Sequence, residues 1–148
     1  MNLIIKLIAS GLGTGYAPVA PGTAGSALAA AAVYFMAPRW NPVTASAATA
    51  ITFAVGVYCT SRAERFWGRD SGRIVIDEVA GMFLSLALVP AGLLNVALAF
   101  VLFRIFDVLK PQPARAAENL QSGWGVMTDD IVAGAYTAVV MWGIARWM

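Results

Sequence analysis

Three long stretches of the chain contain no charged side chain and consist mostly of apolar residues: residues 7–38, 40–61 and 79–103. Each is near or above the length that a helix needs to cross the hydrocarbon core of a bilayer. The third stretch is interrupted by a Pro-Ala-Gly turn at residues 90–92, which favours a helical hairpin over one straight span. The pattern therefore predicts an all-helical, membrane-embedded protein.

Breaks in this pattern predict a multihelical bundle of about five main helices, in a single domain that covers residues 1–148. The helices are expected at about residues 24–37, 43–58, 74–89 and 93–109, and from residue 129 to the end of the chain. Residues 11–26 are too rich in glycine and proline for a regular helix, and they predict an ordered N-terminal loop.

Composition agrees with a membrane protein and excludes other classes. Hydrophobic residues make up 59% of the chain and charged residues 12%, and the mean hydropathy of +0.72 is far above that of an ordinary soluble domain. The net charge of +2 comes without a lysine- or arginine-rich tract, so no nucleic-acid partner is expected.

Four arginines gather in one short polar connection: Arg62, Arg65, Arg69 and Arg73. The positive-inside tendency assigns this connection to the cytoplasm. The predicted hairpin then leaves and returns to that side, and the last helix starts there too. Every polar motif is therefore expected at the cytoplasmic face, while Arg39 lies alone on the other side.

The absence of histidine excludes mechanisms that use histidine as a nucleophile, base or zinc ligand, and the single cysteine, Cys59, excludes an internal disulfide. Cys59 and Arg65 match the C-x₅-R spacing of cysteine-dependent phosphatases. The segment between them has no glycine and continues a helix, so it cannot wrap around a phosphate, and a thiol mechanism is not expected.

Five of the eight acidic residues lie at three places in the sequence: Asp77-Glu78, Asp107 and Asp129-Asp130. Carboxylates are costly in apolar surroundings unless they are paired or bind a metal. Three carboxylate positions that meet on one side of a bundle would form a hard-cation site, with Mg²⁺ as the first candidate.

Hairpin geometry brings two of these positions together. If the turn is centred near Ala91, residue n of one arm packs beside about residue 182 − n of the other. Asp77 then lies level with about Ile105 and Glu78 with Arg104, and Asp107 lies within one turn of both acids. Arg104, Lys110 and Arg115 flank the acids, and a cation beside such donors and a glycine-rich loop suits a phosphate substrate. Thr23 and Ser26 in that loop are weaker candidates for phosphate binding.

Helix dipoles offer a purely structural explanation for some of the acids. Asp129 and Asp130 would complement the dipole in the first turn of the last helix, with Thr128 as the cap, and the same holds for the acids at 77 and 78. Asp107 near the end of its helix opposes the dipole, and a pair with Arg104 is its structural explanation. Asp107 is therefore the most diagnostic of the five.

Several longer motifs are more specific than any one of these residues. They are Gly11-Leu-Gly-Thr-Gly15, Ala20-Pro-Gly-Thr-Ala-Gly-Ser26, Ile76-Asp-Glu78, Phe103-Arg-Ile-Phe-Asp-Val-Leu-Lys-Pro-Gln-Pro113 and Gly125-Val-Met-Thr-Asp-Asp-Ile-Val-Ala-Gly134. In order and spacing they resemble the phosphatidylglycerophosphatase A family over nearly the whole chain. The resemblance implies a bacterial inner-membrane enzyme that converts phosphatidylglycerophosphate to phosphatidylglycerol, with an all-helical fold and Mg²⁺ dependence.

The leading hypothesis is a multi-pass, Mg²⁺-dependent lipid phosphatase in which the five acids are catalytic and metal-binding residues, and Arg104 and Lys110 bind the phosphate. Water activated by the cation is the favoured nucleophile, and an aspartyl-phosphate intermediate remains open. A small cation transporter would instead spread its carboxylates through the depth of the bilayer, and a purely structural bundle would keep them far apart. The sequence leaves open whether the chain forms a homo-oligomer.

Overall fold

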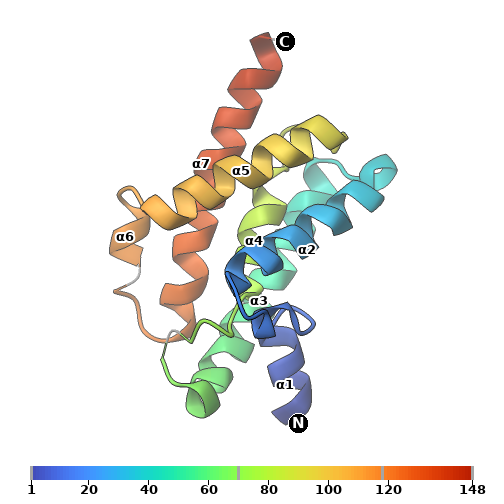
Figure 1. Cartoon of the computed structure of the whole chain (residues 1–148). Coiled ribbons are helices and arrows are strands. Elements are labelled where there is room, and N and C mark those ends of the chain that lie inside the picture. Colours follow the sequence, from blue (N-terminus) through green and yellow to red (C-terminus); the bar gives the residue numbers. More distant parts are fainter. Residues whose placement is uncertain (1, 70, 118, 148) are drawn as a thin grey trace.

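The computed structural model describes residues 2–69, 71–117 and 119–147, and in these residues every regular element is a helix (Figure 1). The α-helices are α1 (Asn2–Ala9), α2 (Pro21–Phe35), α3 (Pro42–Trp67), α4 (Ile76–Ser85), α5 (Leu93–Leu109), α6 (Ala114–Ala117) and α7 (Gly123–Trp147). Two 3₁₀ turns, η1 (Thr14–Tyr16) and η2 (Ala37–Arg39), precede α2 and α3. The all-helical prediction is confirmed: the five predicted helices correspond to α2, α3, α4, α5 and α7, while α1 and α6 are additional.

Helix α4 occupies the centre of the bundle and contacts α2, α3, α5 and α7 (Figure 1). Seven of its residues are buried, including Ala80 and Met82, which are fully buried. With 10 residues, α4 is about 15 Å long, roughly half the thickness of a hydrocarbon core. The predicted hairpin of α4 and α5 is present, but its first arm is too short to span a bilayer as a helix.

The far end of α4 is held by a long-range hydrogen bond. Its last carbonyls have no partner within the helix, as at any helix end. The buried Trp40 donates from Nε1 to the carbonyl oxygen of Leu86 at 3.0 Å, and its ring lies 5.6 Å from that of Phe83. The segment between α2 and α3 is thereby attached to the end of α4 that lies away from Asp77 and Glu78.

Two glycines let α4 and α7 touch through their backbones. A Cβ added to Gly134 would overlap the carbonyl oxygen of Gly81, and one added to Gly81 would lie 2.6 Å from the carbonyl oxygen of Asp130. Asp77 and Asp130 each precede their glycine by four residues, about one helical turn. The close approach of the two helices therefore brings these two carboxylates to the same level.

Helix α7 begins at Gly123, six residues before the predicted start. The predicted start was too late because Gly123 and Gly125 have a low helix propensity. In the structure, a contact with α3 favours glycine at position 123. A Cβ on Gly123 would lie 2.5 Å from the carbonyl oxygen of Val57 in α3, and its N–H donates to Ser61 Oγ at 3.2 Å. Asp129 and Asp130 consequently lie beyond the first turn, so the explanation by helix capping is wrong.

Helix α2 begins at Pro21, so the second half of the predicted loop is helical. Proline is favoured at the first position of a helix. Gly25 then permits close packing, since a Cβ there would lie 2.9 Å from Cβ of Val75. Thr23 and Ser26 are therefore helical residues, and only residues 11–20 form the loop.

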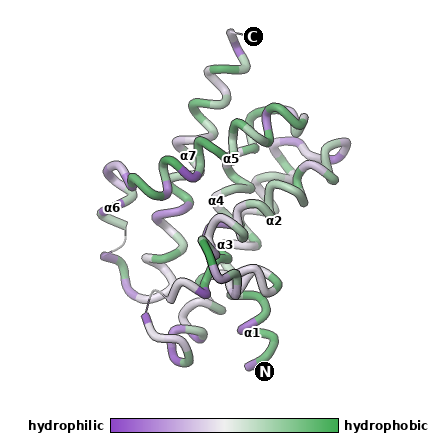
Figure 2. The backbone as a smooth tube through the Cα atoms, in the orientation of Figure 1, coloured by the Kyte–Doolittle hydropathy of each residue, from purple (hydrophilic) through white to green (hydrophobic). Residues whose placement is uncertain are grey.

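Helix α3 starts with a capping box of Asn41 and Thr44 and continues to Trp67, nine residues past its predicted end. Within the described ranges it is the one helix that is long and apolar enough to cross a membrane, by length and composition, and 28% of its most apolar window is buried. The prediction of three spanning-length stretches is thus matched by one candidate span. Figure 2 shows that apolar residues also cover much of α1 and α5.

Candidate active site

Three carboxylates from two helices meet at the crossing of α4 and α7. Asp77 and Glu78 come from the first turn of α4 and Asp130 from α7, and one oxygen from each lies within 4.8 Å of the others. Asp77 is 9% exposed and Asp130 is 2% exposed. This group of three, called the carboxylate trio below, combines two of the three predicted positions.

Each member of the carboxylate trio has a buried oxygen without a hydrogen-bond partner among the described residues: Asp77 Oδ1, Glu78 Oε2 and Asp130 Oδ2. A buried polar atom left without a partner costs about 1–3 kcal/mol, and more when the group is charged. When all three carboxylates are ionised, these atoms cannot satisfy one another, because ionised carboxylates only accept hydrogen bonds. The ionised trio therefore calls for a positively charged ligand.

Burial shifts the protonation equilibria of these groups, which lie outside the candidate span α3. Burial, followed by the neighbouring charge of Glu78, raises the pKa of Asp77 well above its usual range. Burial, followed by the neighbouring charge of Asp107, does the same to the pKa of Asp130. A bound cation would reverse both effects, since it favours the ionised form.

The donor set fits Mg²⁺. All the available donor atoms are carboxylate oxygens, which hard divalent cations prefer. One oxygen from each carboxylate lies within 4.8 Å of the others, so Asp77, Glu78 and Asp130 are the residues that would hold such an ion together.

Asp107 lies beside the trio but has a cationic partner. It is buried in the last turn of α5 and accepts a hydrogen bond from Arg104 Nη1, as the spacing predicts. Arg104 also lies 3.9 Å from Glu78 Oε1 and 3.5 Å from Ser26 Oγ. The prediction that Glu78 and Arg104 lie side by side is confirmed. Arg104 thus connects α2, α4 and α5.

Asp129 is the second paired carboxylate. Lys110 Nζ donates to Asp129 Oδ2 at 2.5 Å, and Asp129 is 5% exposed. Burial raises the pKa of Asp129, and the hydrogen bond from Lys110 opposes this effect. Lys110 caps α5 in a left-handed conformation with φ of 44°. The five predicted acids therefore divide into a trio with unsatisfied oxygens and two acids that bind the predicted phosphate-binding cations.

The start of α2 closes the site from the third side. A Cβ on Gly22 would overlap Glu78 Oε1 and would lie 3.3 Å from Arg104 Nη1. Ser26 is fully buried and donates to the Gly22 carbonyl oxygen at 2.9 Å, while Thr23 is partly exposed. Sequence reasoning gave no structural role to the glycines at 22, 81 and 134. The signal was available for Gly81 and Gly134, which interrupt apolar helical segments, whereas Gly22 stands in a segment rich in glycine and proline.

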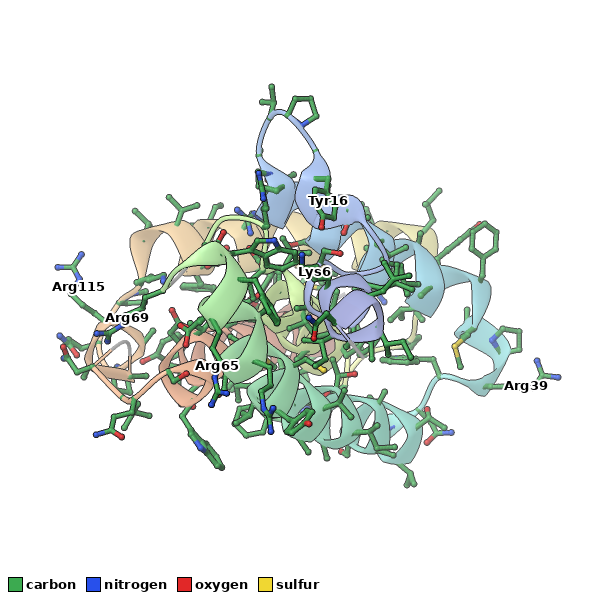
Figure 3. The ribbon with its side chains drawn as sticks, turned by 90° about the horizontal axis from the view of Figure 1, so that it is seen from below. Lys6, Tyr16, Arg39, Arg65, Arg69 and Arg115 are labelled. Atoms are coloured by element: carbon green, nitrogen blue, oxygen red, sulfur yellow. The ribbon has the colours of Figure 1, made fainter. Side chains whose placement is uncertain are left out.

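Other sequence candidates lie apart from this site. Arg115 on α6 is exposed and points away from the body in Figure 3. Cys59 is buried within α3, and Arg65 is exposed on the same helix (Figure 3). A thiol mechanism was not expected, and the burial of Cys59 agrees with this, because buried cysteines are usually unreactive. The acids are gathered at one place, which contradicts the distances expected of a purely structural bundle.

The chain was compared with known proteins. The family model for phosphatidylglycerophosphatase A matches residues 7–145. A putative phosphatidylinositol-3-phosphatase of Bacteroides thetaiotaomicron is 40% identical over 96% of this chain and 93% of its own length. Phosphatidylglycerophosphatase A of Haemophilus influenzae is 37% identical, over 97% and 90%, and that of Escherichia coli is 38% identical, over 95% and 83%. No solved structure matches.

The site is acidic and is flanked by arginine and lysine. Relatives that match this chain over most of their length are named as phosphatases. Together these findings define a phosphoric monoester hydrolase. The chain belongs to the phosphatidylglycerophosphatase A family.

Proposed function

We propose that this protein hydrolyses the phosphate monoester of phosphatidylglycerophosphate, releasing phosphatidylglycerol and inorganic phosphate for phospholipid biosynthesis, with Mg²⁺ as its cofactor. The observation that carries the proposal is the carboxylate trio, with three buried unsatisfied oxygens, beside Arg104 in a chain of this family. Asp77, Glu78 and Asp130 are the proposed cation ligands. When bound, the cation neutralises phosphate charge and lowers the pKa of a nearby water.

The remaining groups are proposed to bind and orient the phosphate. Arg104 has N–H groups beyond the one that binds Asp107, and guanidinium groups bind phosphate oxygens well. The first turn of α2 adds the Thr23 hydroxyl and the positive end of a helix dipole beside Glu78. Lys110 contributes a second cation, held by Asp129.

Hydrolysis joins a water oxygen to phosphorus and breaks the bond from phosphorus to the glycerol oxygen. The water gives up a proton, and the departing glycerol oxygen takes one up. We assign proton acceptance from the water to Asp107, because its carboxylate contacts Arg104 and lies close enough to influence Glu78 and Asp130. A positioned carboxylate serves as a general base for a water that binds within hydrogen-bond reach of it.

The proposed location is the bacterial inner membrane, as a multi-pass protein with its site at the cytoplasmic face. The candidate span α3 and the exposed apolar side chains of α5 support contact with lipid. Figure 3 shows Arg65, Arg69 and Arg115 toward one end of the molecule and Arg39 at the other. A Cβ on Gly56 would lie 3.5 Å from Ile76 of α4, so the first turn of α4 packs beside the middle of α3.

A phosphoinositide is a second candidate substrate, since one relative is named a putative phosphatidylinositol-3-phosphatase. Both substrates present a phosphate monoester on a lipid headgroup, so the same chemistry serves either. The headgroup beyond that phosphate would decide between them.

The test is phosphate release by purified protein in detergent, from phosphatidylglycerophosphate and from phosphatidylinositol 3-phosphate, with and without EDTA. We expect release that EDTA abolishes and added Mg²⁺ restores, faster with the first lipid. Faster release from phosphatidylinositol 3-phosphate would make that lipid the preferred substrate. No Mg²⁺-dependent release from either would overturn the proposal and return attention to the transporter hypothesis.

A further inference from the structure

A surface groove of about 560 Å³ runs between the start of α2 and the outer face of α5. It is lined by Thr23, Phe100, Val101, Arg104, Ile105, Val108 and Leu109. Apart from Thr23 and Arg104, every one of these side chains is apolar. The groove thus has apolar walls and two polar groups from the site already described.

The apolar wall is a continuous stripe on α5. Val101, Ile105 and Val108 follow the spacing of four and three residues that places side chains on one helix face. All three are exposed, and Val101 is 55% exposed. The opposite face of the same helix carries the buried Phe103 and Asp107. Aliphatic side chains arranged in an exposed stripe call for an apolar partner, and Figure 2 shows the apolar character of α5.

The polar end of the groove is also the edge of the carboxylate trio. Arg104 lines the groove and lies 3.9 Å from Glu78 Oε1. Thr23 follows Gly22, whose backbone packs against the Glu78 carboxylate. A ligand with its phosphate at Arg104 would therefore extend from a charged site directly onto an aliphatic surface. This is the arrangement of charge and hydrocarbon in a phospholipid.

A second apolar feature lies on the same side. The loop between η1 and α2 projects from the body of the molecule in Figure 3, beyond α5. Val19 within this loop is 81% exposed. An aliphatic side chain at a projecting loop is suited to insertion among lipid chains, and it borders the groove through the start of α2.

We propose that this groove binds an acyl chain of the lipid substrate while the headgroup phosphate lies at Arg104. The inference rests on the proposed function and adds the surface that distinguishes a lipid from a soluble phosphate ester. The aliphatic contact contributes to affinity, because transfer of apolar surface out of water is favourable. The chain would enter from the side, along α5, without leaving the bilayer.

The test compares dipalmitoyl and dibutyroyl phosphatidylglycerophosphate as substrates in mixed micelles of fixed composition. Val101→Trp fills the groove with an apolar side chain, so it blocks the site without making the surface polar. Val139→Trp is the matched control, an exposed valine on α7 (62% exposed) that does not line the groove. Val101→Ala is a milder second variant, and circular dichroism melting checks the fold of all three.

We expect Val101→Trp to lower kcat/KM about tenfold for the dipalmitoyl substrate, the loss of roughly two methylene contacts, and to leave the dibutyroyl substrate within twofold. Val101→Ala should lower the first value about threefold, and Val139→Trp should change neither. Equal effects on both substrates, or equal effects of Val101→Trp and Val139→Trp, would overturn the groove assignment. A wild-type protein that hydrolyses neither lipid would overturn the proposed function itself, whereas hydrolysis without dependence on chain length would overturn only the groove.

Discussion

Buried carboxylates lie both at the crossing of α4 and α7 and around the end of α5, but only those around the end of α5 are paired with cationic side chains. At the crossing, Asp77, Glu78 and Asp130 each keep a buried oxygen without a partner among the described residues. At the end of α5, Arg104 binds Asp107 and Lys110 binds Asp129. Unsatisfied acids mark where a ligand must supply charge, whereas satisfied acids hold cationic side chains in place for a second ligand. Burial alone does not separate these roles, because both sets are buried.

Asp130→Asn should have the largest effect on this contrast. Loss of one cation ligand should lower kcat about 1,000-fold, equivalent to about 4 kcal/mol in the transition state. The variant should be at least as stable as wild type in EDTA, because burial disfavours the ionised form of Asp130 and an amide does not ionise. Thermal unfolding with and without Mg²⁺ provides the measurement. A Mg²⁺-induced rise in Tm equal to that of wild type would remove Asp130 from the cation site.

Asp107→Asn should lower kcat about 100-fold, in the range expected when a general base is lost. The amide keeps the shape of the side chain but leaves Arg104 with a weaker acceptor. In contrast with Asp130→Asn, this variant should retain the Mg²⁺-induced rise in Tm. A nearly wild-type rate would exclude Asp107 from the site, and loss of the Mg²⁺ response would place it in the trio.

Gly134→Ala tests whether the contact of two backbones sets the geometry of the trio. The added methyl group would overlap the carbonyl oxygen of Gly81 and should push α7 from α4, with a loss of about 1–3 kcal/mol in stability. The Mg²⁺ concentration for half-maximal activity should rise about tenfold. Gly143→Ala in the same helix is the control: a Cβ there meets nothing within 4 Å, and alanine should be neutral or stabilising by up to about 1 kcal/mol. Unchanged Mg²⁺ dependence in Gly134→Ala would contradict this explanation.

Lys110→Met should have the smallest effect of the four. The substitution removes the amine that binds Asp129 and retains most of the aliphatic chain. We expect KM for the lipid to rise about tenfold with kcat changed less than threefold, since a point charge that binds the phosphate contributes mainly to substrate affinity. A fall in kcat with constant KM would instead assign Lys110 to the transition state.

Local signals in the sequence predicted one half of the site. Helix α5 was expected at residues 93–109, and it is observed at Leu93–Leu109, because a Pro-Ala-Gly turn precedes it and prolines follow. The pair of Asp107 with Arg104, and the level of Arg104 with Glu78, followed from helix geometry alone. These features depend on residues that are close in sequence or symmetric about one turn.

The other half depends on contacts between distant segments. The early start of α7 at Gly123 depends on packing against α3, and helix propensity pointed the other way. Capping accounted well for Asp129 and Asp130 until that start was known. The unsatisfied oxygens of the trio are likewise a property of burial between α4 and α7, which no local pattern encodes.

The hydrogen bond from Trp40 to Leu86 has a consequence for motion within the site. It fixes the end of α4 remote from the acids, so a change in cation occupancy should displace the first turn of α4 rather than the whole helix. Amide hydrogens near Asp77 and Glu78 would then exchange faster without Mg²⁺, while those near Ser85 and Leu86 would keep their protection. Because this short central helix is anchored at one end, metal binding would change the structure only in its first turn, which holds Asp77 and Glu78.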